Sequence, residues 1–282
     1  MTDLDLDRLR SWEGREESRE DVLALAPVRA LAATLDHDPG AYRDGGILPP
    51  LYHWLFFLEL TRSGGLARDG HPRKGEFMPP VTFPRRMFAG ARIEYTGDLR
   101  IGEPVRRVSR IGSVRYTEGR SGPLVFVTVV HEIGNAHGIR LTEEQDIVYR
   151  PPTGAQAGAA EPPPVAPDMD FSRSVSPDER LLFRFSALTF NAHRIHYDLP
   201  YTRSEGYPAL VVHGPLTAVL LADLLARQYD RPPLRHFSFR ARNALYLGDR
   251  IRLAGRHVDD AIELAAYRDT GVAAVSGRAV LR

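Results

Sequence analysis

The chain has 282 residues, of which 43% are hydrophobic and 26% charged, which is the composition of an ordinary globular protein with room for one large domain or two small ones. A formal net charge of +1 gives no overall field that would favour nucleic acid as a partner. The absence of cysteine excludes disulfides, thiolate catalysis and Cys-based zinc sites.

The first twenty-one or so residues are acidic and polar, unlike a signal peptide. No later stretch approaches the roughly 20 consecutive apolar residues that a membrane-spanning helix needs. We therefore expect a cytoplasmic protein without a membrane partner.

Segments in the two halves of the chain look like distant copies of each other. Leu23–Pro39 resembles Leu182–Pro200, and each is followed, after a short stretch with glycine, by an apolar segment that predicts a helix. These predicted helices are Leu51–Leu60 and Pro215–Tyr229. Repetition over such a long period indicates duplication of a domain.

Strands are predicted after each of these helices, because β-branched residues become frequent there. Leu99–Glu103 and Leu245–Asp249 share the pattern of a strand that runs into a turn. The longer predicted strands are Leu124–His131 and Ile139–Tyr149 in the first half and Ile251–Val258 and Val272–Leu281 in the second.

The segment 151–167 predicts a linker, because it is rich in proline and alanine and has almost no large apolar side chain. It separates a first domain, residues 1–150, from a second, residues 168–282. In the second domain, the predicted helix Pro215–Tyr229 is apolar around most of its circumference, so we expect a sheet to enclose it.

A polar loop precedes this helix and carries the residues best suited to chemistry. It reads Asn191–Asp198, NAHRIHYD, and is followed by the turn His213-Gly214. The His196 imidazole can exchange a proton near neutral pH. The Gly214 N–H, at the start of a buried helix, can donate to a developing negative charge. The pattern predicts an active site for chemistry beside a carbonyl group.

The loop and turn resemble those of the MaoC-like hydratase/dehydratases, in which Asp-x-Asn-Pro-Leu/Ile-His-x-Asp precedes a His-Gly turn. Within that family, the chain resembles the 3-hydroxyacyl-thioester dehydratases, and the bacterial mesaconyl-CoA and itaconyl-CoA hydratases most fully. The latter resemblance includes Trp12–Arg15, Pro49–Leu58 and Phe83–Gly90. It implies an α+β double hotdog, in which antiparallel sheets each wrap around a buried helix. It also implies a hydro-lyase whose substrate is a CoA thioester and which needs no metal or other cofactor.

The resemblance implies catalytic roles for His196, Asn191 and His193, with Gly214 as the oxyanion donor and His213 fixing its turn. Asn191 stands where the family has its catalytic aspartate, and an amide cannot take a proton from water near neutral pH. His196 would then be the main base, or His193 would share the task. The first half has Leu35-Asp36-His37-Asp38 at the corresponding place and no His-Gly turn, so we expect its site to be degenerate.

Other polar residues have weaker patterns. We expect His37, His53, His71 and His236 to be surface or capping residues, and Asp198 to cap or orient its neighbours. A zinc site at His193 and His196 is disfavoured, because no third ligand has a recognisable spacing. Arginines that could bind the CoA phosphates are Arg85, Arg86 and Arg235, with Arg231, Arg240 and Arg242, although charges on strands usually form a solvated face.

The leading substrate is a short, branched dicarboxylic acyl-CoA such as mesaconyl-CoA or itaconyl-CoA. Alternatives are a longer-chain 3-hydroxyacyl-thioester dehydratase and a non-catalytic acyl-CoA-binding hotdog protein. A thioesterase would need a carboxylate near the buried helix, for which Asp223 and Glu59 are candidates. Stereochemistry, direction and the existence of a homodimer are left open by the sequence.

Overall fold

The computed structural model describes residues 4–119, 122–151, 168–230, 232–269 and 271–282, so the predicted linker falls almost wholly outside the described residues. The strands are β1 (Glu16–Val22), β2 (Arg85–Tyr95), β3 (Pro104–Gly119), β4 (Gly122–Asn135), β5 (Gly138–Arg150), β6 (Phe171–Val175), β7 (Leu234–Ala241), β8 (Ile251–Val258), β9 (Ala261–Arg268) and β10 (Ala273–Leu281). The helices are α1 (Leu6–Arg10), α2 (Leu25–Thr34), α3 (Glu179–Leu188), α4 (Leu199–Ser204) and α5 (Gly214–Gln228). Single 3-10 turns are η1 (Pro39–Ala41), η2 (Tyr52–Leu55), η3 (Ser63–Gly65) and η4 (Arg194–His196).

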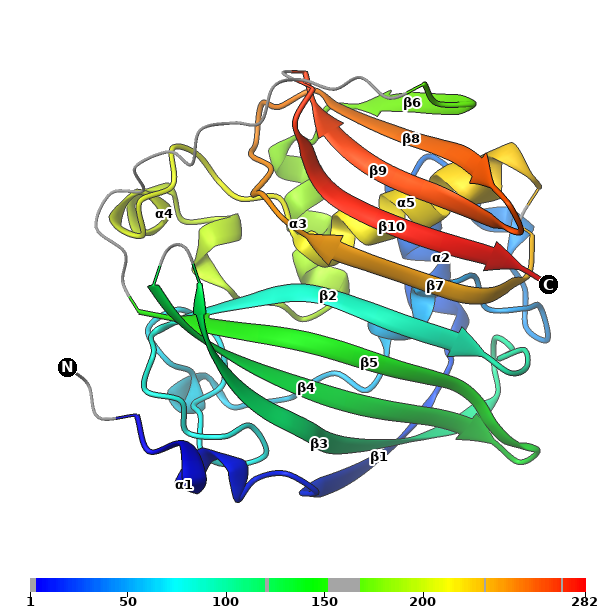
Figure 1. Ribbon diagram of the computed structural model, residues 1–282. Coiled ribbons are helices and arrows are strands. Elements are labelled where there is room, and N and C mark those ends of the chain that lie inside the picture. Colours follow the sequence, from blue (N-terminus) through cyan, green and yellow to red (C-terminus); the bar gives the residue numbers. More distant parts are fainter. Residues whose placement is uncertain (1–3, 120–121, 152–167, 231, 270) are drawn as a thin grey trace.

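All of these strands join one antiparallel sheet in the order β1-β3-β4-β5-β2-β7-β10-β9-β8-β6. The strands of the first half occupy one side of the sheet and those of the second half the other, with β2 beside β7 at the junction (Figure 1). The four longer strands predicted from the sequence are confirmed as β4, β5, β8 and β10.

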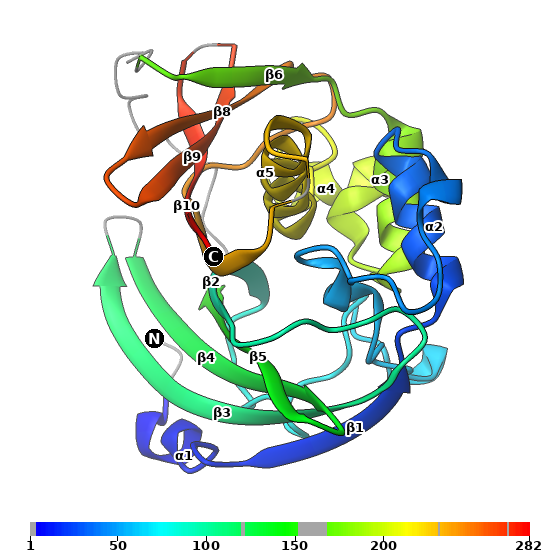
Figure 2. The same cartoon turned by 90° about the vertical axis from the view of Figure 1, so that its right-hand side faces the viewer.

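The enclosed helix is also confirmed, as α5. Pro215 lies in its first turn, where the N–H that proline lacks would have no helical partner. Every side chain from Leu216 to Leu225 is buried. Figure 2 shows α5 between strands β8–β10 on one side and helices α3 and α2 on the other. No helix among the described residues is both long and apolar enough to cross a membrane.

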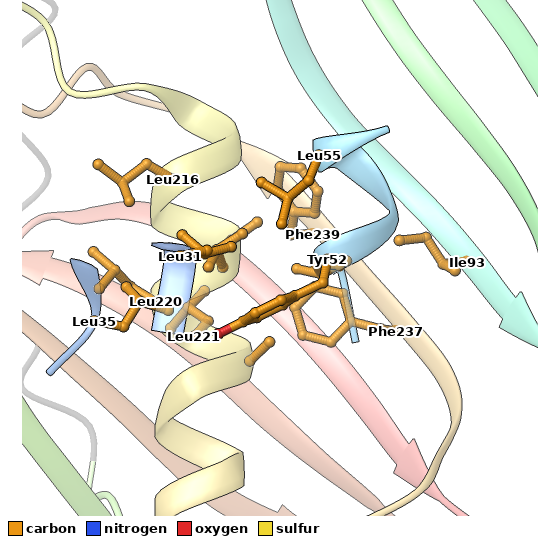
Figure 3. Packing of buried hydrophobic residues seen from close by; sticks show 14 of the residues in the cluster. Leu31, Leu35, Tyr52, Leu55, Ile93, Leu216, Leu220, Leu221, Phe237 and Phe239 are labelled. Atoms are coloured by element: carbon orange, nitrogen blue, oxygen red, sulfur yellow. The ribbon is translucent and has the colours of Figure 1, made fainter. Parts of the chain in front are cut away.

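The prediction of a helix at Leu51–Leu60 is wrong, because only the short turn η2 forms there. Leu51 and Phe57 have φ angles of 68° and 56°, which are left-handed conformations that end a right-handed helix. The turn instead directs Tyr52 and Leu55 toward α5 (Figure 3). The apolar side chains of this segment therefore join the core around α5, in the same buried cluster as its leucines.

The predicted repeat has a structural counterpart, although the two short strands do not form. Leu99–Glu103 and Leu245–Asp249 each make a single isolated bridge. In each half, the first residue of this segment accepts a backbone hydrogen bond of 2.8 Å, donated by Leu48 in the first half and by Val212 in the second. The two halves thus hold the same segment in the same way.

The junction between the halves predicts that neither is stable alone. β2 and β7 pair from Gly90–Arg240 to Glu94–His236, and the core around α5 contains side chains from both halves. We expect residues 168–282 expressed alone to be insoluble or inactive, because they would expose a sheet edge and apolar surface. Co-expression of residues 1–150 should restore soluble, active protein, measured by size-exclusion chromatography and an activity assay. A soluble and fully active second half would contradict this prediction.

Candidate active site

A cavity of about 270 Å³ lies between the two halves beside the start of α5. The first half contributes β2 and β5 residues to its wall, including Met87, Phe88 and Ile147. The second half contributes the predicted loop, the turn before α5 and the segment after β7. Of the predicted site residues, Asn191, His193, His196, Gly214 and Arg86 all line this cavity.

His196 is placed as a proton acceptor. It lies in η4, and its side chain is buried. Its Nδ1–H donates to the carbonyl of Val211 at 2.7 Å, which leaves the lone pair of Nε2 free. Burial disfavours the charged ring and lowers the pKa of His196 to about 4, although the Val211 carbonyl acts in the opposite direction. His196 is therefore neutral at pH 7 and can accept a proton.

His213 packs against the imidazole ring of His196. Its imidazole stacks on that of His196 with ring centroids 3.6 Å apart, and its Nε2 lies 2.8 Å from the Oγ of Ser186. It is the residue before α5 and is 1% exposed, and burial holds its pKa well below the usual value. This placement agrees with the expected role of fixing the turn.

Gly214 is the first residue of α5 and lines the cavity. The first N–H groups of a helix have no partner within it and carry its positive dipole end. A Cβ at Gly214 would meet Phe88 O at 3.7 Å, an ordinary contact, so the protein itself has room for a side chain. Packing within the protein therefore does not require glycine at this position.

Asn191 and Asp198 hold the loop in shape. The Oδ1 of Asn191 accepts the backbone N–H of His193 at 2.9 Å. Asp198 caps α4 by accepting the N–H of Tyr201 at 3.0 Å, and it pairs with Arg194 at 2.7 Å. The expectation that Asp198 caps or orients its neighbours is confirmed.

His71 is the site residue that sequence reasoning missed, since it was expected at the surface. It lines the cavity, and its ring lies 4.3 Å from that of His193. Both oxygens of Asp69 accept hydrogen bonds from it, one from the His71 N–H at 3.0 Å and the other from Nδ1 at 3.2 Å. The only local signal in the sequence is the Asp-Gly-His turn, which does not reveal a contact with a loop about 120 residues away.

The charges of this group follow from its contacts. Burial alone would raise the pKa of Asp69, but the hydrogen bonds from His71 lower it to about 2, so the carboxylate is ionised. Burial lowers the pKa of His71 and of His193, while the Asp69 charge raises both. Near pH 7 the cavity is thus lined by neutral imidazoles, and the ionised Asp69 lies behind one of them, His71.

Metal binding has one geometrically suitable group in the described part of the chain. Ligand atoms of Asp69, His71 and His193 lie within 4.8 Å of one another. Both carboxylate oxygens already accept hydrogen bonds from His71, so the group is satisfied as a hydrogen-bonded pair. The zinc pair considered from the sequence was His193 with His196; His196 is not part of this group.

The other histidines lie elsewhere. His53 was expected at the surface but is buried, with its Nε2 3.1 Å from Glu143. His37 pairs with Asp223 on the far half of α5. His236 pairs with Glu94 at 2.7 Å across the β2–β7 junction, which fits the expected surface role.

The carboxylates considered for a thioesterase are not in this cavity. Asp223 forms ion pairs with Arg173 and Arg227, at 2.5 and 2.9 Å, and Glu59 lines a separate small pocket. The lining of the 270 Å³ cavity contains no acidic side chain among the described residues. Neither thioesterase candidate therefore lies in the cavity that His196 lines; Asp223 lines a different cavity, of about 580 Å³.

The arginines that were expected to bind the CoA phosphates lie in different places, and only some of them line the cavity. Arg86 and Arg242 line the cavity, whereas Arg85 pairs with Glu205 at 2.9 Å. Arg235 lies near the start of β7, while the cavity is at its end, about 20 Å away at 3.3 Å per residue. Arg235 therefore does not line this cavity, and its expected role in binding the CoA phosphates stays a prediction. Arg240 is exposed on β7, and Arg231 lies outside the described residues.

Residues 51–247 match the family model described as hydroxyacyl-thioester dehydratase type 2. The chain belongs to this family. It is 50% identical over 268 residues to mesaconyl-C(4)-CoA hydratase of Chloroflexus aurantiacus, across 94% of this chain and 95% of that protein. The family resemblance stated from the sequence is thereby confirmed.

Solved structures confirm the α+β double hotdog fold. A MaoC-like dehydratase from Phytophthora capsici has a TM-score of 0.74 at 12% identity, over 99% of this chain and 98% of that one. A Mycobacterium tuberculosis protein described as a double hotdog has a TM-score of 0.54 at 14% identity, over 96% of each chain. The first half of the chain is not an exact copy of the second. The short turn η2 stands where a repeat of the long helix α5 would lie.

The first site prediction concerns His196. His196→Ala should reduce turnover by roughly two to four orders of magnitude, the usual scale for a general acid–base group. The thermal midpoint should stay near that of the wild type. Steady-state kinetics and thermal unfolding measure both quantities. Near-normal turnover in a folded variant would rule out this assignment.

The second prediction concerns Asn191, whose side chain accepts a hydrogen bond from the loop backbone. Asn191→Ala should impair turnover, because that acceptor is lost. Asn191→Asp should retain activity or shift it along the pH axis, because a carboxylate can accept the same hydrogen bond. Turnover measured between pH 5 and 9 tests both variants, and a fully active Asn191→Ala would show that this position is dispensable.

The third prediction follows from the neutral state of His196. Its pKa is about 4 in the folded protein and near 6.5 in an unfolded chain, so the unfolded chain binds more protons between these values. The stability contributed by the neutral ring is present above pH 6.5 and is lost as the pH falls toward 4. Wild-type unfolding free energy should therefore fall more steeply over this window than that of His196→Asn, by about 1.4 kcal/mol per pH unit. Equal slopes in urea denaturation would contradict a buried neutral His196.

Proposed function

We propose that this protein is a hydro-lyase that adds water across the double bond of an enoyl-CoA, or removes it from a 3-hydroxyacyl-CoA. The observation that carries the proposal is the neutral, buried His196 facing a cavity that also receives the first N–H groups of α5. The family description and the name of the 50% identical relative are both those of hydratases or dehydratases.

The reaction needs a proton acceptor for water and a donor for the charge that forms on the thioester oxygen. His196 takes a proton from water at Nε2 as the oxygen bonds to the β-carbon. The negative charge that develops on the thioester oxygen is stabilised by the Gly214 N–H and the positive end of α5. The proton taken up by His196 is then delivered to the α-carbon, which completes the addition and leaves His196 neutral again. CoA thioester is the substrate, and these steps need no cofactor.

The leading substrate is a short dicarboxylic acyl-CoA such as mesaconyl-C4-CoA. A cavity volume of about 270 Å³ lies just below the ~300–1,000 Å³ of typical ligand pockets, which favours a small acyl group over a long chain. Arg86 lines the cavity, and within the described part of the chain its guanidinium forms no ion pair, so it is available to a distal carboxylate. Itaconyl-CoA and longer enoyl-CoAs are the alternative substrates.

Mass-spectrometric detection of water addition across a panel of enoyl-CoAs tests the activity. We expect the highest kcat/KM for mesaconyl-C4-CoA and a lower value for a four-carbon enoyl-CoA without the carboxylate. If water is added to none of these substrates, the alternative function, a non-catalytic acyl-CoA-binding protein, is favoured instead.

Arg86→Met tests the carboxylate contact. It should lower kcat/KM for the dicarboxylic substrate about 10- to 100-fold, the range for a hydrogen bond to a charged group, and change the uncharged substrate little. The matched control is Arg278→Met, an exposed arginine on β10 that pairs with Asp260 and does not line the cavity. Equal losses on both substrates would place Arg86 on the CoA moiety instead.

The remaining expectations from the sequence belong to this proposal and are tested by separate experiments. They are a cytoplasmic location, no nucleic-acid or membrane partner, no metal requirement, and a homodimer as one open state. Cell fractionation, metal analysis of the purified protein and light scattering address them in turn.

A further inference from the structure

The proposed site has a base in its loop but no carboxylate there. Position 191 is an asparagine, and its oxygen is engaged by the His193 N–H. No acidic residue appears in the described lining of the cavity. The carboxylate nearest to the histidines comes from the other half of the chain, where Asp69 stands directly behind His71.

The turn that carries Asp69 and His71 is fixed against the loop that carries His193 and His196. The backbone N–H of Arg194 donates to the carbonyl of Asp69 at 2.9 Å. Gly70 has φ of 93°, and a Cβ there would lie 1.8 Å from the carbonyl oxygen of Ala192. Two backbones this close cannot move apart to admit a side chain without displacing His71, so the contact sets the position of the His71 ring.

We propose that His71, oriented by Asp69, is a second acid–base catalytic residue of this site, contributed by the first half of the chain in place of an aspartate at position 191. The inference rests on the proposed hydration of an enoyl-CoA. His71 is the catalytic residue, because it lines the cavity, and Asp69 is its positioning residue.

The contacts between the three rings give the proton a path from water to the α-carbon. An O–H bond of water breaks as its oxygen bonds to the β-carbon, and the electron pair of the double bond moves toward the α-carbon and thioester oxygen. The released proton passes from His196 to His71 through His193, whose ring centroid lies 5.5 Å from the first and 4.3 Å from the second. Ionised Asp69 balances the imidazolium at His71. The His71 imidazolium then gives its proton to the α-carbon, so one water is added, the rings return to their neutral state, and nothing is oxidised or reduced.

The direct test compares His71→Ala and Asp69→Asn with a matched pair outside the site. Asp170, which precedes β6, and His257, on β8, form a similar carboxylate–imidazole contact at 2.7 Å at exposed positions, and neither lines the cavity. We expect His71→Ala to lower kcat about 100-fold with KM within about threefold, and added imidazole to restore part of the rate. Asp69→Asn should lower kcat about 10-fold, with Asp69→Glu recovering part of it. His257→Ala and Asp170→Asn should behave as wild type.

Gly70→Ala provides a second test that leaves His71 itself unchanged. It should lower kcat as His71→Ala does, whereas Gly64→Ala, on the same segment but with no atom within 4 Å of the added Cβ, should not. Thermal midpoints within a few degrees of wild type show that the variants fold.

Three outcomes would overturn the inference. Near-wild-type kcat in a folded His71→Ala, while His196→Ala is inactive, refutes the role of His71 and leaves the hydratase function standing. Activity lost on chelation and regained with zinc would show that Asp69, His71 and His193 hold a metal instead. A wild-type protein that hydrates no enoyl-CoA refutes the proposed function, and the inference with it.

Discussion

The structure depends on the burial of one apolar helix. α5 is enclosed along Leu216–Leu225, and strands of both halves pack against it. At about 25 cal/mol per Å² of buried apolar surface, such a helix is a large stabilising contribution that neither half can obtain alone. Because the same helix begins at Gly214, the interaction that holds the halves together also fixes the first N–H groups at the cavity.

Burial at that end of α5 has an electrostatic consequence. The His196 and His213 rings stack on each other in a buried position, and their loss of hydration lowers both pKa values, so the rings are kept neutral. A neutral imidazole is a ready proton acceptor, but the cation that it forms is costly there without a nearby negative charge. Asp69 is the described carboxylate placed to balance it, which gives the contact between the 69–71 turn and the catalytic loop a reason beyond packing.

The first half illustrates how tertiary context overrides an apolar pattern. Leu51–Leu60 has the hydrophobicity of a helix, yet the left-handed residues Leu51 and Phe57 restrict it to η2. The core has one helix at this place, and Tyr52 and Leu55 fill the space against it (Figure 3). A local pattern reports that a segment is buried, but the space left by the rest of the fold decides its shape.

The sequence by itself determined what depends on neighbours along the chain. The apolar run of α5, the β-branched strands and the loop of Asn191, His193 and His196 before His213-Gly214 were all predicted, because periodicity and spacing are local properties. Only the tertiary structure decided that His71 and Asp69 join that loop and that Arg235 does not. Those placements are set by the pairing of β2 with β7 and by the docking of one turn on another, and contacts between distant segments leave no periodic trace in a single sequence.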